Sequence, residues 1–252
     1  MSDRLYGSVI RVALGLFGAL DLRFTVDGVD NIPDEGGAVL AANHVSFLDF
    51  IFVGVPAHDK GRLVRFLAKQ SVFDNPLSGP LMRAMHHIPV DRSAGSAAYA
   101  AAIDALGAGE LVGVFPEATI SRSFVPRELK TGAARMSLDA GVPLLPVVVW
   151  GGQRLWTAGR WPRPTRHVPI AVHVGAPLDR TSAESAADLT GRLRDRLAAS
   201  TEAVQRAYPA PASDRERWWQ PAYLGGAAPT PEVAAHLEAR ALPHARRSRS
   251  SS

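Results

Sequence analysis

Residues 38–49 read Ala-Val-Leu-Ala-Ala-Asn-His-Val-Ser-Phe-Leu-Asp, a short apolar run followed at once by polar side chains. The apolar part, Ala38–Ala42, has the length and composition of a buried strand. Similar runs recur along the chain, and segments with helical periodicity separate them. This alternation predicts an α/β fold, a single domain in which helices flank a mixed, mostly parallel sheet.

The predicted strands and helices cover most of residues 23–208. Strands are expected at 23–26, 38–42, 64–68, 88–90, 111–115, 144–150 and 168–174. Helices are expected at 96–106, 131–140 and 182–208. Thr181 and Glu184 have the spacing of a capping box, which predicts that the last helix begins between them.

The composition excludes several classes of protein. The chain has 252 residues and no cysteine, so disulfides, thiolate metal sites and thiol nucleophiles are impossible. Its net charge of +4 equals the charge of Arg240, Arg246, Arg247 and Arg249, which leaves the rest of the chain formally neutral. Because nucleic-acid-binding domains usually carry a basic stripe on the folded body, no nucleic-acid partner is expected.

Residues 1–24 form a predicted amphipathic helix. The apolar run in it, residues 12–20, is shorter than the roughly 20 residues that a spanning helix needs. One helical face carries Leu5, Val9, Val12, Leu16 and Leu20, and Arg4 and Arg11 lie on the other. The apolar face either packs on the domain or lies in a membrane interface, with the arginines near anionic headgroups.

The last part of the chain, residues 209–252, is an extension rich in Pro, Ala and Arg that is expected to be partly disordered. Its segment 217–223, Arg-Trp-Trp-Gln-Pro-Ala-Tyr, is typical either of a contact with lipid headgroups or of a segment packed back onto the domain. From about Ala241 onward an untethered tail is expected.

Two polar segments follow predicted strands and carry the candidate chemistry. Asn43 and His44 leave the end of the strand 38–42, and Asp49 follows five residues after His44. A carboxylate that accepts from one imidazole nitrogen leaves the other free to take a proton from an alcohol. No Gly-x-Ser-x-Gly elbow supplies that alcohol, so it must come from the substrate. Residues 115–121 follow another strand, where a site in such a sheet would be completed.

Four blocks together resemble the glycerolipid acyltransferase family, the lysophosphatidic acid and glycerol-3-phosphate acyltransferases. Residues 43–49 match the family's Asn-His-x4-Asp block, and residues 88–92, Ile-Pro-Val-Asp-Arg, are similar to the block that ends in Arg. Residues 115–121, Phe-Pro-Glu-Ala-Thr-Ile-Ser, are similar to Phe-Pro-Glu-Gly-Thr-Arg-Ser. Residues 142–147 resemble the Val-Pro block, and residues 130–135 resemble the Lys-x-Gly-Ala-Ala helix start. The resemblance covers residues 25–180 and makes 25–208 an acyltransferase domain.

The resemblance implies a role for each matching residue. His44 is the expected general base and Asp49 its orienting partner. The expected substrate-binding residues are Asn43, Lys69, Arg92, Glu117 and Thr119, with Lys69 and Arg92 near the phosphate of the acceptor. A dianionic phosphate needs two or more cations, which fits this assignment.

The chain departs from the family at two positions of the third block. Ala118 and Ile120 stand where the family usually has Gly and Arg, so a cation expected near the phosphate is missing. Arg122 could replace it if the loop is reshaped, and Arg122→Ala would then raise the acceptor KM at least tenfold. Without that replacement, the pose and the identity of the acceptor are open.

The expected function is acyl transfer in phospholipid biosynthesis. The resemblance implies a peripheral, monotopic enzyme on the cytoplasmic face of the cell membrane that uses acyl-CoA or acyl-carrier protein as cosubstrate. The expected acceptor is a lysophospholipid, 1-acyl-sn-glycerol 3-phosphate. No metal or bound cofactor is expected, since no histidine pair has zinc-ligand spacing, and His86 and His87 are expected to be structural.

The sequence leaves three alternatives open. The acceptor could be glycerol 3-phosphate or another lipid alcohol. The chain could be a non-catalytic lipid-binding protein, although the intact His44 and Asp49 argue against that. It could also be a thioester hydrolase, although cations suited to phosphate favour a phosphate-bearing acceptor over water.

Overall fold

The computed structural model describes residues 2–91, 95–179 and 184–247, and its centre is one seven-stranded sheet. The strands are β1 (Arg23–Asp27), β2 (Ala38–Ala42), β3 (Val64–Lys69), β4 (Ile88–Val90), β5 (Leu111–Val114), β6 (Leu144–Trp150) and β7 (Pro169–Val174). Their order is β1-β7-β6-β2-β5-β3-β4, with β6 and β7 antiparallel and the other neighbours parallel. The predicted fold is confirmed, and each of these strands overlaps a strand expected from the sequence.

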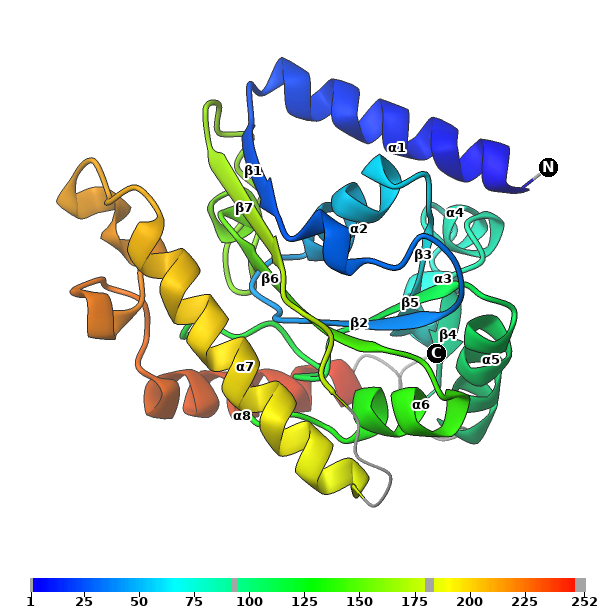
Figure 1. Ribbon diagram of the computed structural model, residues 1–252. Helices are drawn as coiled ribbons and strands as arrows, with labels where there is room; N and C mark the ends of the chain where they lie inside the picture. The colour runs from blue at the N-terminus through cyan, green and yellow to red at the C-terminus, as the bar shows by residue number, and fades with distance from the viewer. Residues whose placement is uncertain (1, 92–94, 180–183, 248–252) are drawn as a thin grey trace.

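Helices cover both faces of this sheet (Figure 1). On one face lie α1 (Ser2–Ala19) and α2 (Asp49–Asp59), and on the other lie α5 (Gly95–Gly107), α6 (Gly132–Ala140) and α7 (Ala186–Ala207). The short helices α3 (Gln70–Asp74) and α4 (Gly79–Ala84), which the sequence did not predict, connect β3 to β4.

The central strand β2 is buried on both faces because it lies between two apolar cores. Leu40 belongs to the core beneath α1 and α2, together with Phe52. Val39 belongs to the opposite core, together with Leu193 of α7. A strand covered on both faces needs no polar alternation, which explains its continuous apolar run. The chain therefore leaves the sheet at a fixed point, immediately before Asn43.

The helix α1 packs on the domain through a face that overlaps the expected one only in part, because Val9 is packed against the core but other members of that face are exposed. Tyr6 and Phe17 are buried, and the Tyr6 hydroxyl donates a hydrogen bond to the Val64 carbonyl (2.8 Å). Val12 and Leu16, from the expected apolar face, are 66% and 61% exposed. Apolar side chains surround most of the helix, so periodicity could not tell which stripe meets the domain. One apolar stripe is therefore inside and another is on the surface.

The helix α7 begins later than expected. Ser185 is its N-cap, and the Ser185 hydroxyl oxygen accepts from the Asp188 N–H (3.2 Å). Thr181, half of the expected capping box, lies outside the described residues. Glu184 forms an ion pair with Arg192 (2.7 Å).

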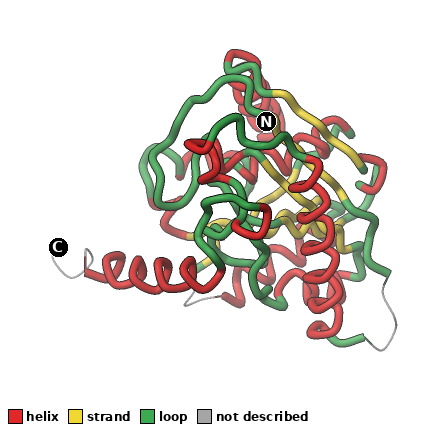
Figure 2. Tube along the Cα trace, turned by 90° about the vertical axis from the view of Figure 1, so that its left-hand side faces the viewer, coloured by secondary structure: helices red, strands yellow, loops and turns green. Residues whose placement is uncertain are grey.

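The C-terminal extension forms η3 (Asp214–Trp219), η4 (Ala222–Leu224) and α8 (Pro231–Arg247). Trp219 is buried and meets Tyr208 edge to face, with ring centroids 5.5 Å apart. The aromatic segment therefore packs back onto the domain. The helix α8 continues past Ala241, so the backbone there is helical instead of an untethered tail, and it leads away from the body (Figure 2).

Candidate active site

The imidazole of His44 is held by Asp49 at the end of β2. Asp49 is the first residue of α2, and its Oδ2 lies 3.0 Å from His44 Nδ1. The same oxygen accepts from the N–H groups of Val45 (2.7 Å) and Ser46 (2.8 Å). Burial raises the pKa of Asp49, while these three contacts act in the opposite direction. The geometry fixes the ring and leaves His44 Nε2 available to a hydroxyl group.

His44 lies in the wall of an apolar cavity of about 780 Å³. Its ring stacks on Phe115, with centroids 4.2 Å apart and planes inclined by 20°. The cavity runs between α1, α2, α4 and the ends of β3 and β5. Its apolar walls include Tyr6, Ile10, Leu14, Phe50, Val55, Leu67 and Met82. Lys69 and Lys130, both exposed, are the lysines among its described lining residues.

Asn43 positions this site without reaching the cavity. Its Nδ2 donates to the Val149 carbonyl (3.1 Å), and its Oδ1 accepts from the Val149 N–H (2.7 Å). The side chain is 1% exposed, so its amide is fully used inside the protein. Asn43, which was expected to bind substrate, instead holds the start of the His44 loop against β6 through these two hydrogen bonds.

Glu117 joins two loops at this edge of the sheet. Its Oε1 accepts from the His44 N–H (2.9 Å), and its Oε2 accepts from the Arg127 N–H (3.3 Å). Burial raises the pKa of Glu117 to about 8, although both hydrogen bonds and the Arg127 charge act against this. Glu117 lines a second, polar cavity and is not among the lining residues of the apolar one.

The raised pKa of Glu117 predicts a pH-dependent stability. The folded protein keeps a proton that the unfolded chain loses between about pH 4.5 and pH 8, so the stability that Glu117 contributes falls as pH rises through this range. Glu117→Gln removes this titration. From pH 4.5 to pH 8 we expect the unfolding free energy of the wild type to fall, relative to that of the variant, by on the order of 4 kcal/mol. Urea unfolding at both ends measures it, and a constant difference would contradict it.

The remaining expected residues are placed as follows. Arg92 lies outside the described residues. Thr119 is half-buried, and neither it nor Arg122 is among the described residues that line the two cavities. The Arg122 guanidinium lies beside Gly159, and the Ile120 side chain is buried. The structure thus brings His44 and Lys69 to the apolar cavity, with the buried Asp49 holding His44 from behind, and leaves Arg122 apart from it.

Two lining residues were missed from the sequence. Lys130 belongs to the helix-start segment 130–135, and its place between the strand β5 and α6 is the signal in the sequence that it lies near the site. Trp156 pairs with the half-exposed Phe47, with ring centroids 4.8 Å apart, and nothing in the local sequence indicated this.

His87 is structural, as expected. It is buried, and its Nδ1 accepts from the Phe66 N–H (3.1 Å). Burial and the Arg65 charge lower its pKa to about 4, so it is neutral. Within residues 2–91, 95–179 and 184–247, no group of three metal-ligating side chains occurs. No described helix is both long enough and apolar enough to cross a bilayer.

Comparisons with known proteins identify the family. The sequence model of the acyltransferase family matches residues 23–150. A 1-acyl-sn-glycerol-3-phosphate acyltransferase of Bacillus subtilis is 30% identical over 79% of this chain and 91% of its own. One from Borreliella burgdorferi is 28% identical over 78% and 77%. The crystal structure of the acyltransferase PlsC from Thermotoga maritima superposes with a TM-score of 0.65 at 25% identity, over 77% of each chain. With its His44–Asp49 pair at the end of β2, the chain therefore belongs to the acyltransferase family, among its PlsC-like members.

Proposed function

We propose that this acyltransferase moves a fatty acyl group from a thioester to the free hydroxyl of 1-acyl-sn-glycerol 3-phosphate, in phospholipid biosynthesis. The observation that carries the proposal is the His44 imidazole, held 3.0 Å from Asp49 in the wall of an apolar cavity of about 780 Å³. Two relatives bear the name of this reaction. A pocket of this size is in the usual range for small-molecule sites of roughly 300 to 1,000 Å³.

The geometry supports general-base catalysis. His44 Nε2 takes the hydroxyl proton as the oxygen attacks the thioester carbonyl, and Asp49 stabilises the imidazolium that forms. Collapse of the tetrahedral intermediate breaks the carbon–sulfur bond, and the imidazolium returns its proton to the thiolate. The reaction needs no metal or bound cofactor, and acyl-CoA or acyl-carrier protein serves as cosubstrate.

The apolar walls suit the acyl chain. Ile10, Leu14 and Val55 line the cavity together with His44, so a chain lying among them would bring its carbonyl to the base. Burial of each methylene group is worth about 0.8 kcal/mol, which favours a long chain.

Transfer of a labelled acyl group tests the function. We expect wild-type protein to convert acyl-CoA or acyl-carrier protein and 1-acyl-sn-glycerol 3-phosphate to the diacyl product. Parallel reactions contain glycerol 3-phosphate or no acceptor. Product formed only in the reaction with glycerol 3-phosphate would change the assigned acceptor. Free fatty acid in every reaction would indicate a hydrolase. Lipid that is bound but not converted would indicate a carrier.

The phosphate of the acceptor is proposed to meet the cations at the cavity edge. Lys130 lines the cavity, whereas Arg122 lies beside Gly159. We therefore expect Lys130→Ala to raise the acceptor KM about tenfold, equivalent to about 1.4 kcal/mol, and Arg122→Ala to leave it within about twofold. Initial rates at varied acceptor concentration measure both. The reverse ranking would restore Arg122 as the replacement for the missing family arginine.

The protein is proposed to act at the cytoplasmic face of the cell membrane, bound from one side. Val12 and Leu16 expose an apolar stripe on α1. Two more exposed apolar side chains lie nearby, because α4 packs against α1: Leu77 just before α4 and Leu81 within it. Exposed apolar clusters of this kind mark interaction surfaces. Since α1 also lines the cavity, a lipid acceptor could enter from the bilayer.

Substitutions on the exposed stripe test this placement without removing the buried one. We expect Val12→Asp with Leu16→Asp to reduce cosedimentation with anionic phospholipid vesicles at least about tenfold, because both side chains would leave the interface. The control is Val233→Asp on α8, an exposed apolar position on a helix at the other side of the sheet (Figure 1). Equal vesicle binding by all three proteins would contradict the assignment.

A further inference from the structure

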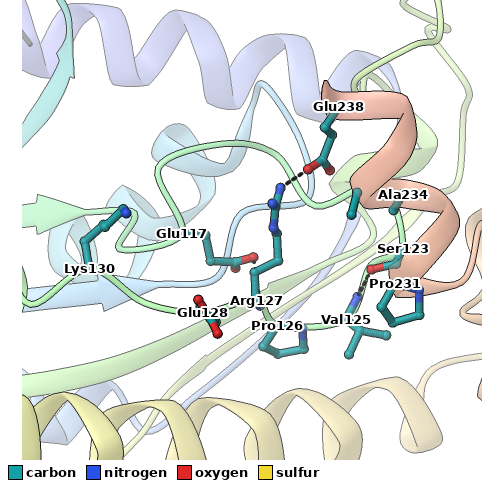
Figure 3. A pocket seen from close by; sticks show the side chains of 11 residues that line it. Glu117, Ser123, Val125, Pro126, Arg127, Glu128, Lys130, Pro231, Ala234 and Glu238 are labelled. Carbon is teal, nitrogen blue, oxygen red and sulfur yellow. Dashed lines mark hydrogen bonds and ion pairs between the residues drawn. The ribbon is translucent and has the colours of Figure 1, made fainter. Parts of the chain in front are cut away.

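A second, polar cavity of about 360 Å³ lies between Glu117 and the C-terminal helix α8. Figure 3 shows Arg127 reaching toward Glu238 on α8, with Glu117 and Lys130 on the side away from that helix. Lys130 lines both cavities, so the polar cavity adjoins the apolar one. Through its backbone contact with Glu117, His44 belongs to the same edge of the sheet.

The Glu238 carboxylate is only partly satisfied in this cavity. Its Oε2 pairs with the Arg127 guanidinium, and its side chain is 15% exposed. Its Oε1 is buried and has no hydrogen-bond partner among the described residues. A buried acceptor without a partner destabilises the protein by about 1 to 3 kcal/mol. A phosphate group has three acceptor oxygens and could accept hydrogen bonds from both Arg127 and Lys130.

The helix α8 covers the cavity without filling it. Among its described side chains, residues 231–239, Ala234 is the one that is buried. Val233 and Leu237 are 49% and 38% exposed. Little apolar surface therefore holds α8 in place, and helices of this kind detach at low free-energy cost.

The charges of the cavity favour an anion once Glu238 leaves. With α8 in place, Arg127 and Lys130 face two carboxylates, Glu238 and Glu128. Burial raises the pKa of Glu117 to about 8, so its carboxyl is mostly neutral at neutral pH. Without Glu238 the cations are in excess. A guanidinium and an ammonium group that line the same cavity suit a phosphate monoester.

We propose that α8 is an inhibitory segment, in which the Glu238 carboxylate occupies an anion site of Arg127 and Lys130 that the phosphate of the acceptor takes over. The proposal rests on the proposed function, because it assigns the anion to the acceptor. Free phosphate has the same binding chemistry and is separated by experiment. Arg127 acts as a substrate-binding residue that lies outside the four family blocks, and Glu238 as its internal competitor.

Binding to the full-length protein tests the site without turnover. Glycerol 3-phosphate and inorganic phosphate are titrated by calorimetry into wild type and Glu238→Gln. We expect both probes to bind the variant at least tenfold more tightly. Glu232→Gln, an exposed position on the same helix, should bind like wild type. The double variant Arg127→Gln with Glu238→Gln should lose the gain. An unchanged affinity in Glu238→Gln, or a gain that survives in the double variant, would overturn the proposal.

Steady-state kinetics then identify the source of the phosphate. We expect Glu238→Gln to lower the acceptor KM at least threefold and inorganic phosphate to compete with the acceptor. Tighter phosphate binding with an unchanged acceptor KM would overturn the assignment to the acceptor. Failure of the wild type to transfer acyl groups would refute the proposed function, and the calorimetric comparison would still report on the anion site.

Discussion

His44→Ala is expected to lower kcat for acyl transfer by about 10³-fold, with little change in the acceptor KM. A positioned general base contributes about 10²- to 10⁴-fold to such reactions, and in this protein Nε2 is the ring nitrogen left available by the Asp49 contact. The substitution removes proton transfer and leaves the other side chains of the cavity wall in place, so the substrates still bind. Radiolabelled product formed at saturating substrate measures the effect.

The fold should survive this substitution. The His44 side chain is 20% exposed, and it contributes a ring stack on Phe115 and one hydrogen bond. Loss of both is worth about 2 kcal/mol, well below a typical free energy of unfolding. His58→Ala, on the last turn of α2, is the matched control and should keep the wild-type rate. A His44→Ala protein with more than about a tenth of the wild-type kcat would refute the general-base role.

Features that depend on neighbours in the sequence could be predicted. The apolar runs marked the strands because a doubly covered sheet requires continuous hydrophobic segments. His44 and Asp49 could be paired because they are five positions apart, in the short loop between the end of β2 at Ala42 and the start of α2. The third block was located correctly beside His44, because parallel strands β2 and β5 end at the same edge.

Features that depend on distant contacts could not be predicted. Asn43 resembles a substrate ligand in sequence, and its structural role follows from Val149, 106 positions away. The pairing of Arg127 with Glu238 spans 111 positions and involves an extension expected to be partly disordered. Hydrophobic periodicity does not encode such pairs, because either side chain alone is an ordinary surface charge.

The sequence predicted the helix α1 but could not tell which of its apolar side chains pack on the domain. Its expected face and its buried face are both apolar, so the choice between them depends on the shape of the surface that receives the helix. On the buried face the Tyr6 hydroxyl donates a hydrogen bond to the Val64 carbonyl, a contact that the sequence of the helix does not indicate. The exposed Val12 and Leu16 are then left for another surface, which is the basis of the proposed membrane contact.

Asp49→Asn is expected to lower kcat by about 10³- to 10⁴-fold, comparable to loss of the carboxylate in Ser-His-Asp enzymes. In the wild type one carboxylate oxygen accepts from His44 Nδ1 and from two backbone N–H groups. If the amide oxygen keeps these contacts, the amide nitrogen takes the position of the buried Oδ1, which has no partner among the described residues. If the amide is flipped, its NH2 group faces the backbone N–H groups of Val45 and Ser46, which are donors themselves. Either way the negative charge that stabilises the imidazolium is lost.

The combination of both substitutions separates orientation from independent catalysis. If Asp49 acts only through His44, the double variant His44→Ala with Asp49→Asn should be no slower than His44→Ala alone, because groups that act as a unit are non-additive. Asp59→Asn, at the exposed far end of α2, should keep the wild-type kcat. Urea unfolding of Asp49→Asn checks that the loss of rate is not loss of fold. Losses that multiply in the double variant would mean that Asp49 contacts the reacting atoms itself, and its assignment as a positioning residue would be wrong.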